Sequence, residues 1–208
     1  ACLKFLRNNL LYPADDLNTG AAPDDFYTRV DRIVEKVPAG SAGIYFLPWL
    51  YGERSPIDDQ FVRGGFYNLS LNNNRTQMMR AVLEGVGLNG RWLLTHVEGM
   101  IGRKFAAVNF IGGGANSAVW SQIIADVFNR PIRQMKEPLM ANSRGTAILA
   151  LLALKRLRMD EVSKAVEVNR VFEPNPQHRA IYDEMFERFV EIYTRNKPIW
   201  LKLNKSSP

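Results

Sequence analysis

The sequence predicts an α/β domain, because strand-like and helical segments alternate along its second half. Residues 105–111 form an apolar, strand-like run, and residues 131–135 form a second predicted strand. Helices are expected over residues 118–129 and 139–155. This strand–helix–strand–helix order implies parallel pairing of the two strands, with helices on the faces of the sheet.

Length and composition favour one globular unit. The 208 residues can bury a single sizeable core, and the hydrophobic fraction of 46% is ordinary for a soluble domain. We expect neither a membrane span nor a signal peptide, because no apolar run approaches ~20 residues and no charged-then-apolar leader is present. The single cysteine, Cys2, cannot form an internal disulfide and suits a reducing cytoplasm. With two histidines and no cysteine pair, the sequence lacks the ligands that a zinc site needs.

The net charge of +6 raises the question of nucleic-acid binding. The basic residues are scattered, however, and the densest run, residues 155–158, closes a predicted helix. Cations at that position complement the helix C-terminus, so we interpret them as a solvated cap. No aromatic residues interleave with them as a base-stacking platform requires. We therefore predict no nucleic-acid partner.

The first part of the chain is predicted to contain the end of one helix and the start of another. Residues 2–11 lack an initiating methionine and an N-cap, which indicates a chain cut from something longer. A loop over residues 12–22 follows. The next helix is expected to begin at Pro23, with Asp24 and Asp25 near its positive end.

A strand is expected over residues 43–51 and a long helix over residues 75–96. Glycines at 85, 87 and 90 of this helix each cost about 1 kcal/mol relative to alanine. We interpret them as places where another element, or a ligand, comes close, with helix-on-strand packing favoured.

The last part is predicted to be helical. A short amphipathic helix is expected over residues 160–168, a rigid connector over 172–176, and a terminal helix over 177–195 that packs on the main body. The tail after Lys202 is polar and expected to be disordered.

The turn between the strand at 105–111 and the helix from Ala118 is the most informative stretch. Gly112, Gly113 and Gly114 there allow backbone conformations that a Cβ forbids and leave room for a ligand against the main chain. The amides that follow would face a phosphate at the helix N-terminus. A tight corner that binds nothing is the equally weighted alternative. The pattern is neither GxGxxG nor a GxxxxGK[ST] phosphate loop.

Residues 41–154 resemble the C-terminal half of the FGGY family of carbohydrate kinases, and most closely its xylulose-kinase-like members. Three ordered motifs carry the resemblance: FLPWLYGERSP at 46–56 with VRG at 62–64, the segment 64–85, and GGGANSAVWSQIIAD at 112–126 with RGTA at 144–147. Asn68 stands where the family prefers glycine, and Thr146 where it usually carries alanine.

The resemblance implies an α/β fold of the actin-like, ribonuclease-H-like class, with a mixed sheet flanked by helices. Residues 1–22 would be the end of an inter-lobe helix and a loop, and residues 23–208 the C-terminal nucleotide-binding lobe of a two-lobe kinase. ATP and Mg²⁺ would be its cofactors. The sugar, a pentulose by this resemblance, would be bound mainly by the missing N-terminal lobe, which would also hold the catalytic base. We expect a cytoplasmic protein, and the sequence leaves open whether it forms a homodimer through its last helix.

The same resemblance implies which residues contact the nucleotide. The expected set is Gly112, Gly113, Gly114, Ala115, Asn116, Ser117, Lys4, Gly145 and Thr146. The three glycines would let adenine and ribose lie against the backbone, and the amides around Ala115 would face the α-phosphate. Gly145 and Thr146 would close the far side of the base pocket, although helix N-capping explains them equally well. No metal ligand and no catalytic residue are assigned within this chain.

Several acidic residues are interpreted as structural. Glu53 with Arg54 is expected to form an ion pair or an inter-lobe contact, and Glu84 to cap backbone amides from a buried position. Asp126 is expected to pair with Arg130 at i+4. Alternatives that remain open are a kinase of another polyol or ketose, a non-catalytic actin-like nucleotide module, and a basic nucleic-acid binder.

Overall fold

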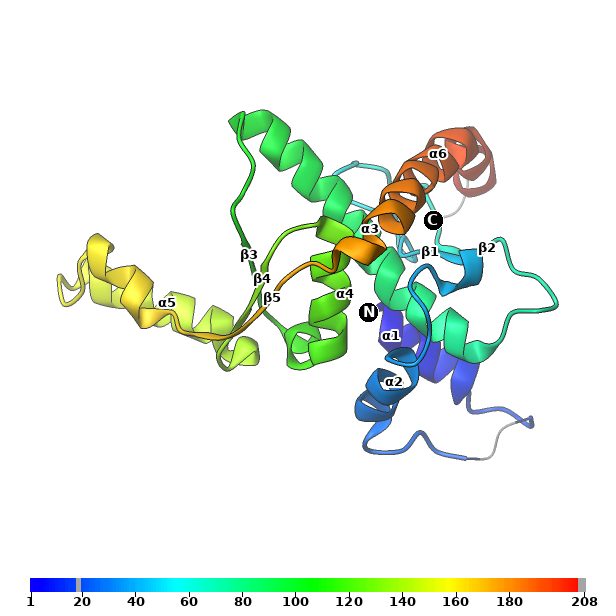
Figure 1. The fold of residues 1–208 in the computed structure, drawn as a ribbon, viewed down its shortest axis with the longest axis horizontal. Helices are drawn as coiled ribbons and strands as arrows, with labels where there is room; N and C mark the ends of the chain where they lie inside the picture. Colours follow the sequence, from blue (N-terminus) through cyan, green and yellow to red (C-terminus); the bar gives the residue numbers. More distant parts are fainter. Residues whose placement is uncertain (18–19, 206–208) are drawn as a thin grey trace.

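A computed structural model describes residues 1–17 and 20–205 of the chain. Figure 1 shows helix α3 running through the middle of a body to which α1, α2, α4 and α6 belong, while α5 projects away from it. The helices are α1 (Cys2–Phe5), α2 (Phe26–Val34), α3 (Arg75–Ile101), α4 (Ala118–Phe128), α5 (Ala141–Ala153) and α6 (Arg179–Asn204). The strands are β1 (Tyr45–Leu47), β2 (Gly65–Tyr67), β3 (Val108–Phe110), β4 (Ile132–Met135) and β5 (Val168–Phe172).

The larger sheet has the order β3-β4-β5 and is mixed. Strands β3 and β4 are parallel, with Val108 opposite Ile132, which confirms the pairing predicted for the strand–helix–strand unit. Strand β5 then joins β4 antiparallel, with Phe172 opposite Ile132. Helix α4 covers one face of this sheet, where Ile124 and Ala125 are buried together with Ile132 and Phe172.

Strand β5 was not expected from the sequence. A helix was predicted over residues 160–168, but the structure forms a short 3-10 helix over Met159–Ala165 and then the strand. Four of the five β5 residues are exposed, so the strand shows no alternation of buried and exposed positions. Its backbone pairing with β4 holds it in place.

Helix α3 begins and ends at clear sequence signals. The Asn74 side chain accepts hydrogen bonds from the amides of Thr76 and Gln77, and the Gln77 side chain accepts one from the Asn74 amide, which completes a capping box. The helix extends five residues beyond the predicted end at His96, as far as Ile101. Gly102 then adopts a left-handed conformation with φ 67°, a common way to terminate a helix.

The glycines of α3 mark close contacts with other elements, as the sequence suggested. A Cβ on Gly85 would lie 2.1 Å from the carbonyl oxygen of Phe46 in β1, so only glycine fits there. A Cβ on Gly87 would lie 3.3 Å from Ile124, and one on Gly90 would lie 2.9 Å from Phe128, both in α4. The β1 strand and α4 therefore pack directly on the α3 backbone.

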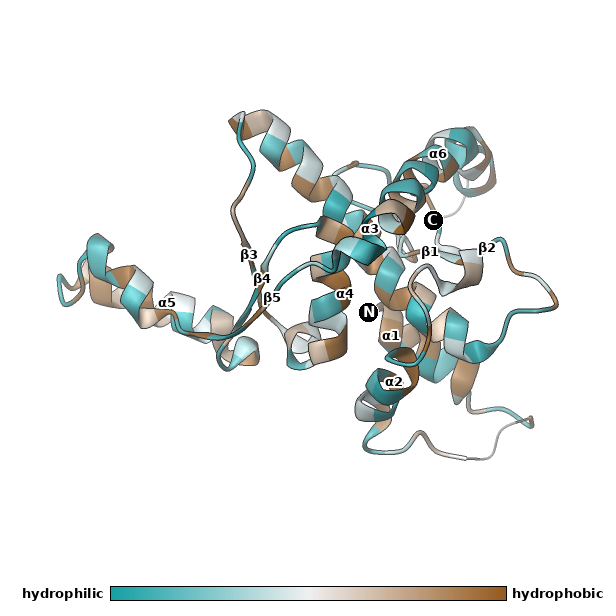
Figure 2. Ribbon diagram, viewed as in Figure 1, coloured by the Kyte–Doolittle hydropathy of each residue, from teal (hydrophilic) through white to brown (hydrophobic). Residues whose placement is uncertain are grey.

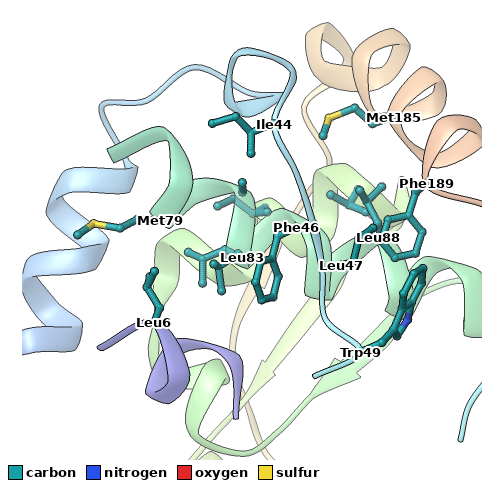
Figure 3. Packing of buried hydrophobic residues seen from close by; sticks show 14 of the residues in the cluster. Leu6, Ile44, Phe46, Leu47, Trp49, Met79, Leu83, Leu88, Met185 and Phe189 are labelled. Atoms are coloured by element: carbon teal, nitrogen blue, oxygen red, sulfur yellow. The ribbon is translucent and has the colours of Figure 1, made fainter. Parts of the chain in front are cut away.

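The main core surrounds α3. Figure 3 shows Leu83 and Leu88 of α3 among side chains from β1, from the first helix and from α6. Leu6, which lies in a short π-helical extension of α1 (Leu6–Leu11), is buried in the same cluster. Phe189 of α6 packs against Trp49 in a tilted arrangement, with ring centroids 5.1 Å apart. The expected packing of the terminal helix on the body is confirmed.

Helix α6 is longer than predicted. It was expected to end at Arg195, but it continues to Asn204 with Pro198 inside it. The disorder expected after Lys202 therefore does not hold for residues 203–204, which are helical, and residues 206–208 lie outside the described residues.

Helix α5 differs from the other helices of more than one turn, because none of its residues is buried. It was predicted from residue 139 to 155, and the structure gives a short 3-10 helix over Pro138–Met140 followed by α5 itself. Figure 2 shows apolar residues along this projecting helix. Leu149 and Leu154 are 69% and 70% exposed.

Candidate functional site

A pocket of about 860 Å³ lies where α1, α2, α3 and the glycine turn meet. Its walls include Lys4 of α1, Val86 of α3, and Gly113 and Gly114 of the turn. The Trp120 ring at the start of α4 forms part of the same wall. The pocket combines apolar surface with a few polar groups, which is the usual make-up of a small-molecule site.

Two of the three glycines are required by the backbone or by packing. Gly112 has φ 81°, a conformation that favours glycine, and its amide donates to the Pro138 carbonyl at 2.9 Å. A Cβ on Gly114 would lie 2.8 Å from the Trp120 ring.

Gly113 is different from these two. It does not have a positive φ, and the nearest atom to a Cβ there would be Leu139 Cδ2 at 3.8 Å, an ordinary contact. Neither the backbone nor the packing of the fold therefore demands glycine at 113, and this residue lines the pocket.

Ser117 ends the turn and begins α4. Its Oγ accepts a hydrogen bond from the Trp120 amide at 2.9 Å, which caps the helix. The same hydroxyl donates to Oδ1 of Asp31 on α2 at 2.7 Å. One side chain thus fixes the helix start and connects the turn to the opposite wall of the pocket.

Asp31 is a polar residue of the pocket wall that the sequence did not indicate. Burial raises the pKa of its carboxyl above the ordinary value, and the Ser117 hydrogen bond partly opposes that shift. Nothing in the sequence separates Asp31 from the solvated face of an amphipathic helix, since Phe26, Val30 and Val34 form the buried stripe beside it.

Five of the nine residues expected to contact the nucleotide line this one pocket: Lys4, Gly113, Gly114, Asn116 and Ser117. Gly112 precedes them in the turn. Ala115 is fully buried, and its carbonyl accepts a hydrogen bond from Gln134 of β4. These two residues shape the turn from outside the lining.

The structure places Gly145 and Thr146 elsewhere. Both lie inside α5, which begins at Ala141, so neither residue is an N-cap and the N-capping alternative is wrong. The Thr146 hydroxyl donates to the Asn142 carbonyl at 3.1 Å within the helix. Neither residue is part of the pocket lining, and their contact with the nucleotide stays a prediction.

Glu53 and Asn89 form the far wall. The Glu53 carboxylate accepts hydrogen bonds from the backbone amides of Arg54 and Ser55 and from the Asn89 side chain. Asn89 in turn accepts one from the indole of Trp49 at 3.0 Å. The expected side-chain ion pair between Glu53 and Arg54 does not form. The Glu53 carboxylate instead accepts hydrogen bonds from backbone amides of its own loop.

The other acidic residues have structural roles. Glu84 is fully buried and accepts hydrogen bonds from the Gly40 amide, the Ser41 hydroxyl and Tyr182, which confirms that it caps a backbone amide. Arg80 pairs with it at 2.7 Å.

Asp126 does not pair with Arg130. It accepts from the Asn175 amide and from His178 instead, while Arg130 contacts Glu98 at 3.4 Å.

Over the part of the chain that the structure describes, no three His, Cys, Asp or Glu side chains converge on a possible metal position. These described residues therefore do not form a metal site of their own. Within the same residues, no helix is both long and apolar enough to cross a membrane.

Comparison with known proteins places the chain in a family. The model of the FGGY family of carbohydrate kinases, C-terminal domain, matches residues 6–154. A xylulose kinase of Staphylococcus epidermidis is 34% identical over 180 residues, which cover 85% of this chain and 36% of that protein. A gluconokinase of Bacillus licheniformis is 29% identical, over 81% of this chain and 33% of that protein.

Solved structures agree with these matches. The gluconate kinase of Lactobacillus acidophilus superposes with a TM-score of 0.81 and 29% identity, over 98% of this chain and 39% of that one. The ligand-bound xylulose kinase of the same organism gives 0.80 over the same shares. The chain thus spans well under half the length of the relatives it matches. The actin-like, ribonuclease-H-like fold class predicted from the sequence is confirmed, and the chain belongs to the FGGY family of carbohydrate kinases.

Proposed function

We propose that this chain is the adenosine-binding part of an ATP-dependent carbohydrate kinase. The observation that carries the proposal is Gly113, which lines the pocket. Neither its backbone conformation nor its packing requires glycine, so the missing side chain leaves space in the pocket wall. A ligand that lies flat against the main chain needs such space. The α4 N-terminus behind the turn adds the partial positive charge that favours a phosphate nearby.

The chain's own residues supply binding and orientation. The turn from Gly113 to Ser117 would hold the adenosine, and the Lys4 ammonium on the opposite wall would attract its phosphates. Mg²⁺ would accompany the nucleotide phosphates, where it neutralises the charge that develops in phosphoryl transfer. A base is also needed to accept the proton of the sugar hydroxyl. We assign that base, and most of the sugar contacts, to polypeptide outside this chain.

For the substrate we propose a pentulose such as xylulose, in line with the resemblance of the sequence motifs. Relatives with closely similar identity include a gluconokinase and an autoinducer-2 kinase of Enterobacter. A kinase of another ketose or polyol is therefore the alternative. Assay of the longer polypeptide against ketopentoses, gluconate and polyols distinguishes them, because the correct substrate has the highest kcat/KM.

The division of the chain follows from the same proposal. Residues 1–22 would be the end of an inter-lobe helix with its loop, and residues 23–208 the C-terminal lobe. A homodimer through α6 and a cytoplasmic location remain predictions, and sedimentation of the purified chain tests the first of them.

Calorimetric titration with Mg-ADP and Mg-GDP tests the proposal, with Gly113→Val and Gly99→Val as a matched pair of variants. A Cβ on Gly99 would meet nothing within 4 Å, and this residue lies outside the pocket lining on α3. We expect adenine-selective binding that Gly113→Val abolishes and Gly99→Val retains. Failure of the folded wild-type chain to bind ADP, or equal binding by the Gly113 variant, would contradict the proposal.

A further inference from the structure

We propose that Asp31, on α2 beside the end of the glycine turn, is a specificity-determining residue for the nucleotide. Its carboxylate would accept a hydrogen bond from a donor group of adenosine, either the exocyclic amine or a ribose hydroxyl. The inference rests on the proposed function above and adds to it a residue outside the glycine turn.

The position of Asp31 is the first argument. Asp31 lines the pocket together with Tyr27 and Thr28 from the preceding turn of α2. Its Oδ1 accepts from Ser117 Oγ at 2.7 Å, which fixes the carboxylate beside the glycine turn. Among the described residues, its second oxygen, Oδ2, has no hydrogen-bond partner. An ionised carboxylate can accept about four hydrogen bonds, so the group retains capacity for a ligand.

The charge around Asp31 is the second argument. Asp25, the N-cap residue of α2, is exposed and pairs with Arg29 and Arg32. Asp31 is half-buried, and no cation among the described residues lies within ion-pair distance of it. Burial raises the pKa of its carboxyl, and nearby Glu35 raises that pKa further. A neutral donor from a ligand would compensate part of this desolvation, because a hydrogen bond to the charged form favours it.

A purely structural role would need only one of the two oxygens. The bond to Ser117 requires an acceptor at Oδ1, and an asparagine provides that acceptor at nearly the same size and shape. Asp31→Asn would therefore keep the link between α2 and the helix cap. It would place an NH₂ donor where Oδ2 is now an acceptor. A role in recognition and a role in holding the turn thus respond differently to the same substitution.

The test is calorimetric titration of the 208-residue chain with Mg-ADP, Mg-IDP and Mg-2′-deoxy-ADP. IDP lacks the exocyclic amine, and 2′-deoxy-ADP lacks the 2′-hydroxyl. The variants are Asp31→Asn, Asp31→Glu as a second change at the site, and Asp25→Asn as a control on the same stretch but outside the pocket lining. Far-UV circular dichroism and a thermal melt establish that each variant is folded.

We expect the wild type to bind ADP roughly 10-fold or more tightly than the analogue lacking the recognised donor, which is the size of one hydrogen bond to a charged group. In Asp31→Asn the ratio of ADP affinity to analogue affinity should fall to about 1, because ADP loses affinity while the analogue changes by less than about 2-fold. The control Asp25→Asn should keep the wild-type ratio. If Asp31→Asn loses the preference for ADP over IDP, the recognised donor is the exocyclic amine. If it loses the preference for ADP over 2′-deoxy-ADP, the recognised donor is the 2′-hydroxyl.

Two results overturn the inference while the proposed function stands. One is a wild-type ratio that persists in both folded Asp31 variants. The other is an equal loss of affinity for all three nucleotides, which would mean that Asp31 only holds the turn. Absence of binding of any nucleotide by the wild type is a different outcome, because it refutes the proposed function itself.

Discussion

Helices α3 and α5 are both rich in apolar residues, yet they have opposite surroundings. Ten residues of α3 are buried, whereas none of α5 is. Strand β1 and helices α4 and α6 enclose α3, while the main neighbours of α5 are the 3-10 turns on either side of it. In Figure 2 the apolar positions of α5 lie along a helix that projects from the body.

An apolar sequence pattern therefore shows that a helix can be buried, but it does not show that the same chain buries it. Helix α3 is stabilised by neighbours supplied by this same chain, and its glycines let those neighbours approach the backbone. The main contacts of helix α5 are with the 3-10 turns that flank it in sequence. Equivalent substitutions in the two helices should therefore have very different effects on stability.

The largest effect is expected from the buried ion pair. Glu84→Ala removes the carboxylate that pairs with Arg80 at 2.7 Å, where both side chains are almost fully buried. An uncompensated buried charge costs about 3–5 kcal/mol. Asp160→Ala, which breaks the exposed pair with Arg158 beyond α5, should cost about 0–1 kcal/mol. Urea denaturation measures both, and similar values for the two variants would break the comparison.

The next effect comes from one identical substitution in each helix. Leu83→Ala empties a fully buried position of α3 and should lower the free energy of unfolding by about 2–5 kcal/mol. Leu149→Ala in α5 changes a side chain that is 69% exposed and should stay within about 0.5 kcal/mol of the wild type. A large loss in Leu149→Ala would show that α5 is covered in solution.

Glycine substitutions should have opposite signs in the two helices. Gly85→Ala brings a Cβ to 2.1 Å from the Phe46 carbonyl oxygen, and such overpacking costs about 1–3 kcal/mol or more. Gly145→Ala in α5 meets nothing within 4 Å and should stabilise the chain by about 0.5–1 kcal/mol, because alanine favours the helix. Thermal melts of the two variants check the sign directly.

The smallest effect concerns alkaline pH on the α6 side of the core. Burial and the neighbouring Asp59 raise the pKa of Tyr193 to about 12 from an ordinary 10.0. Between these values the folded chain binds more protons than the unfolded chain, so the free energy of unfolding falls as pH rises. Tyr193→Phe should flatten part of this fall, and Tyr51→Phe, at a tyrosine that is 99% exposed, should not. An unchanged slope in Tyr193→Phe would contradict this account.

The parts of the fold that could be predicted are those with a local signal. The start of α3 at Arg75, the glycine turn and the alternation from β3 to β4 all depend on residues close in sequence. Strand β5 could not be predicted, because its partner β4 is more than thirty residues away and its own residues are mostly exposed. Asp31 was missed for the same reason: its contact with Ser117 spans 86 positions.

The site itself was predicted in part. The resemblance to the family indicated Gly113, Ser117 and Lys4, and the structure brings the two turn residues into one pocket with Lys4 from the first helix. The motif could not indicate which glycine is needed by the fold and which is free for a ligand. That distinction needed the φ of Gly112 and the Trp120 ring beside Gly114.

The most direct test of the central claim is a ¹H–¹⁵N spectrum of the 208-residue chain during titration with Mg-ADP. We predict saturable shifts of the amides from Gly112 to Ser117, with the amide of Gly99 unchanged. The amide of Gly145 reports in the same spectra whether α5 contributes to the site. Unshifted amides at residues 112–117 in a folded chain, with ADP at millimolar concentration, would contradict the claim that this turn binds the nucleotide.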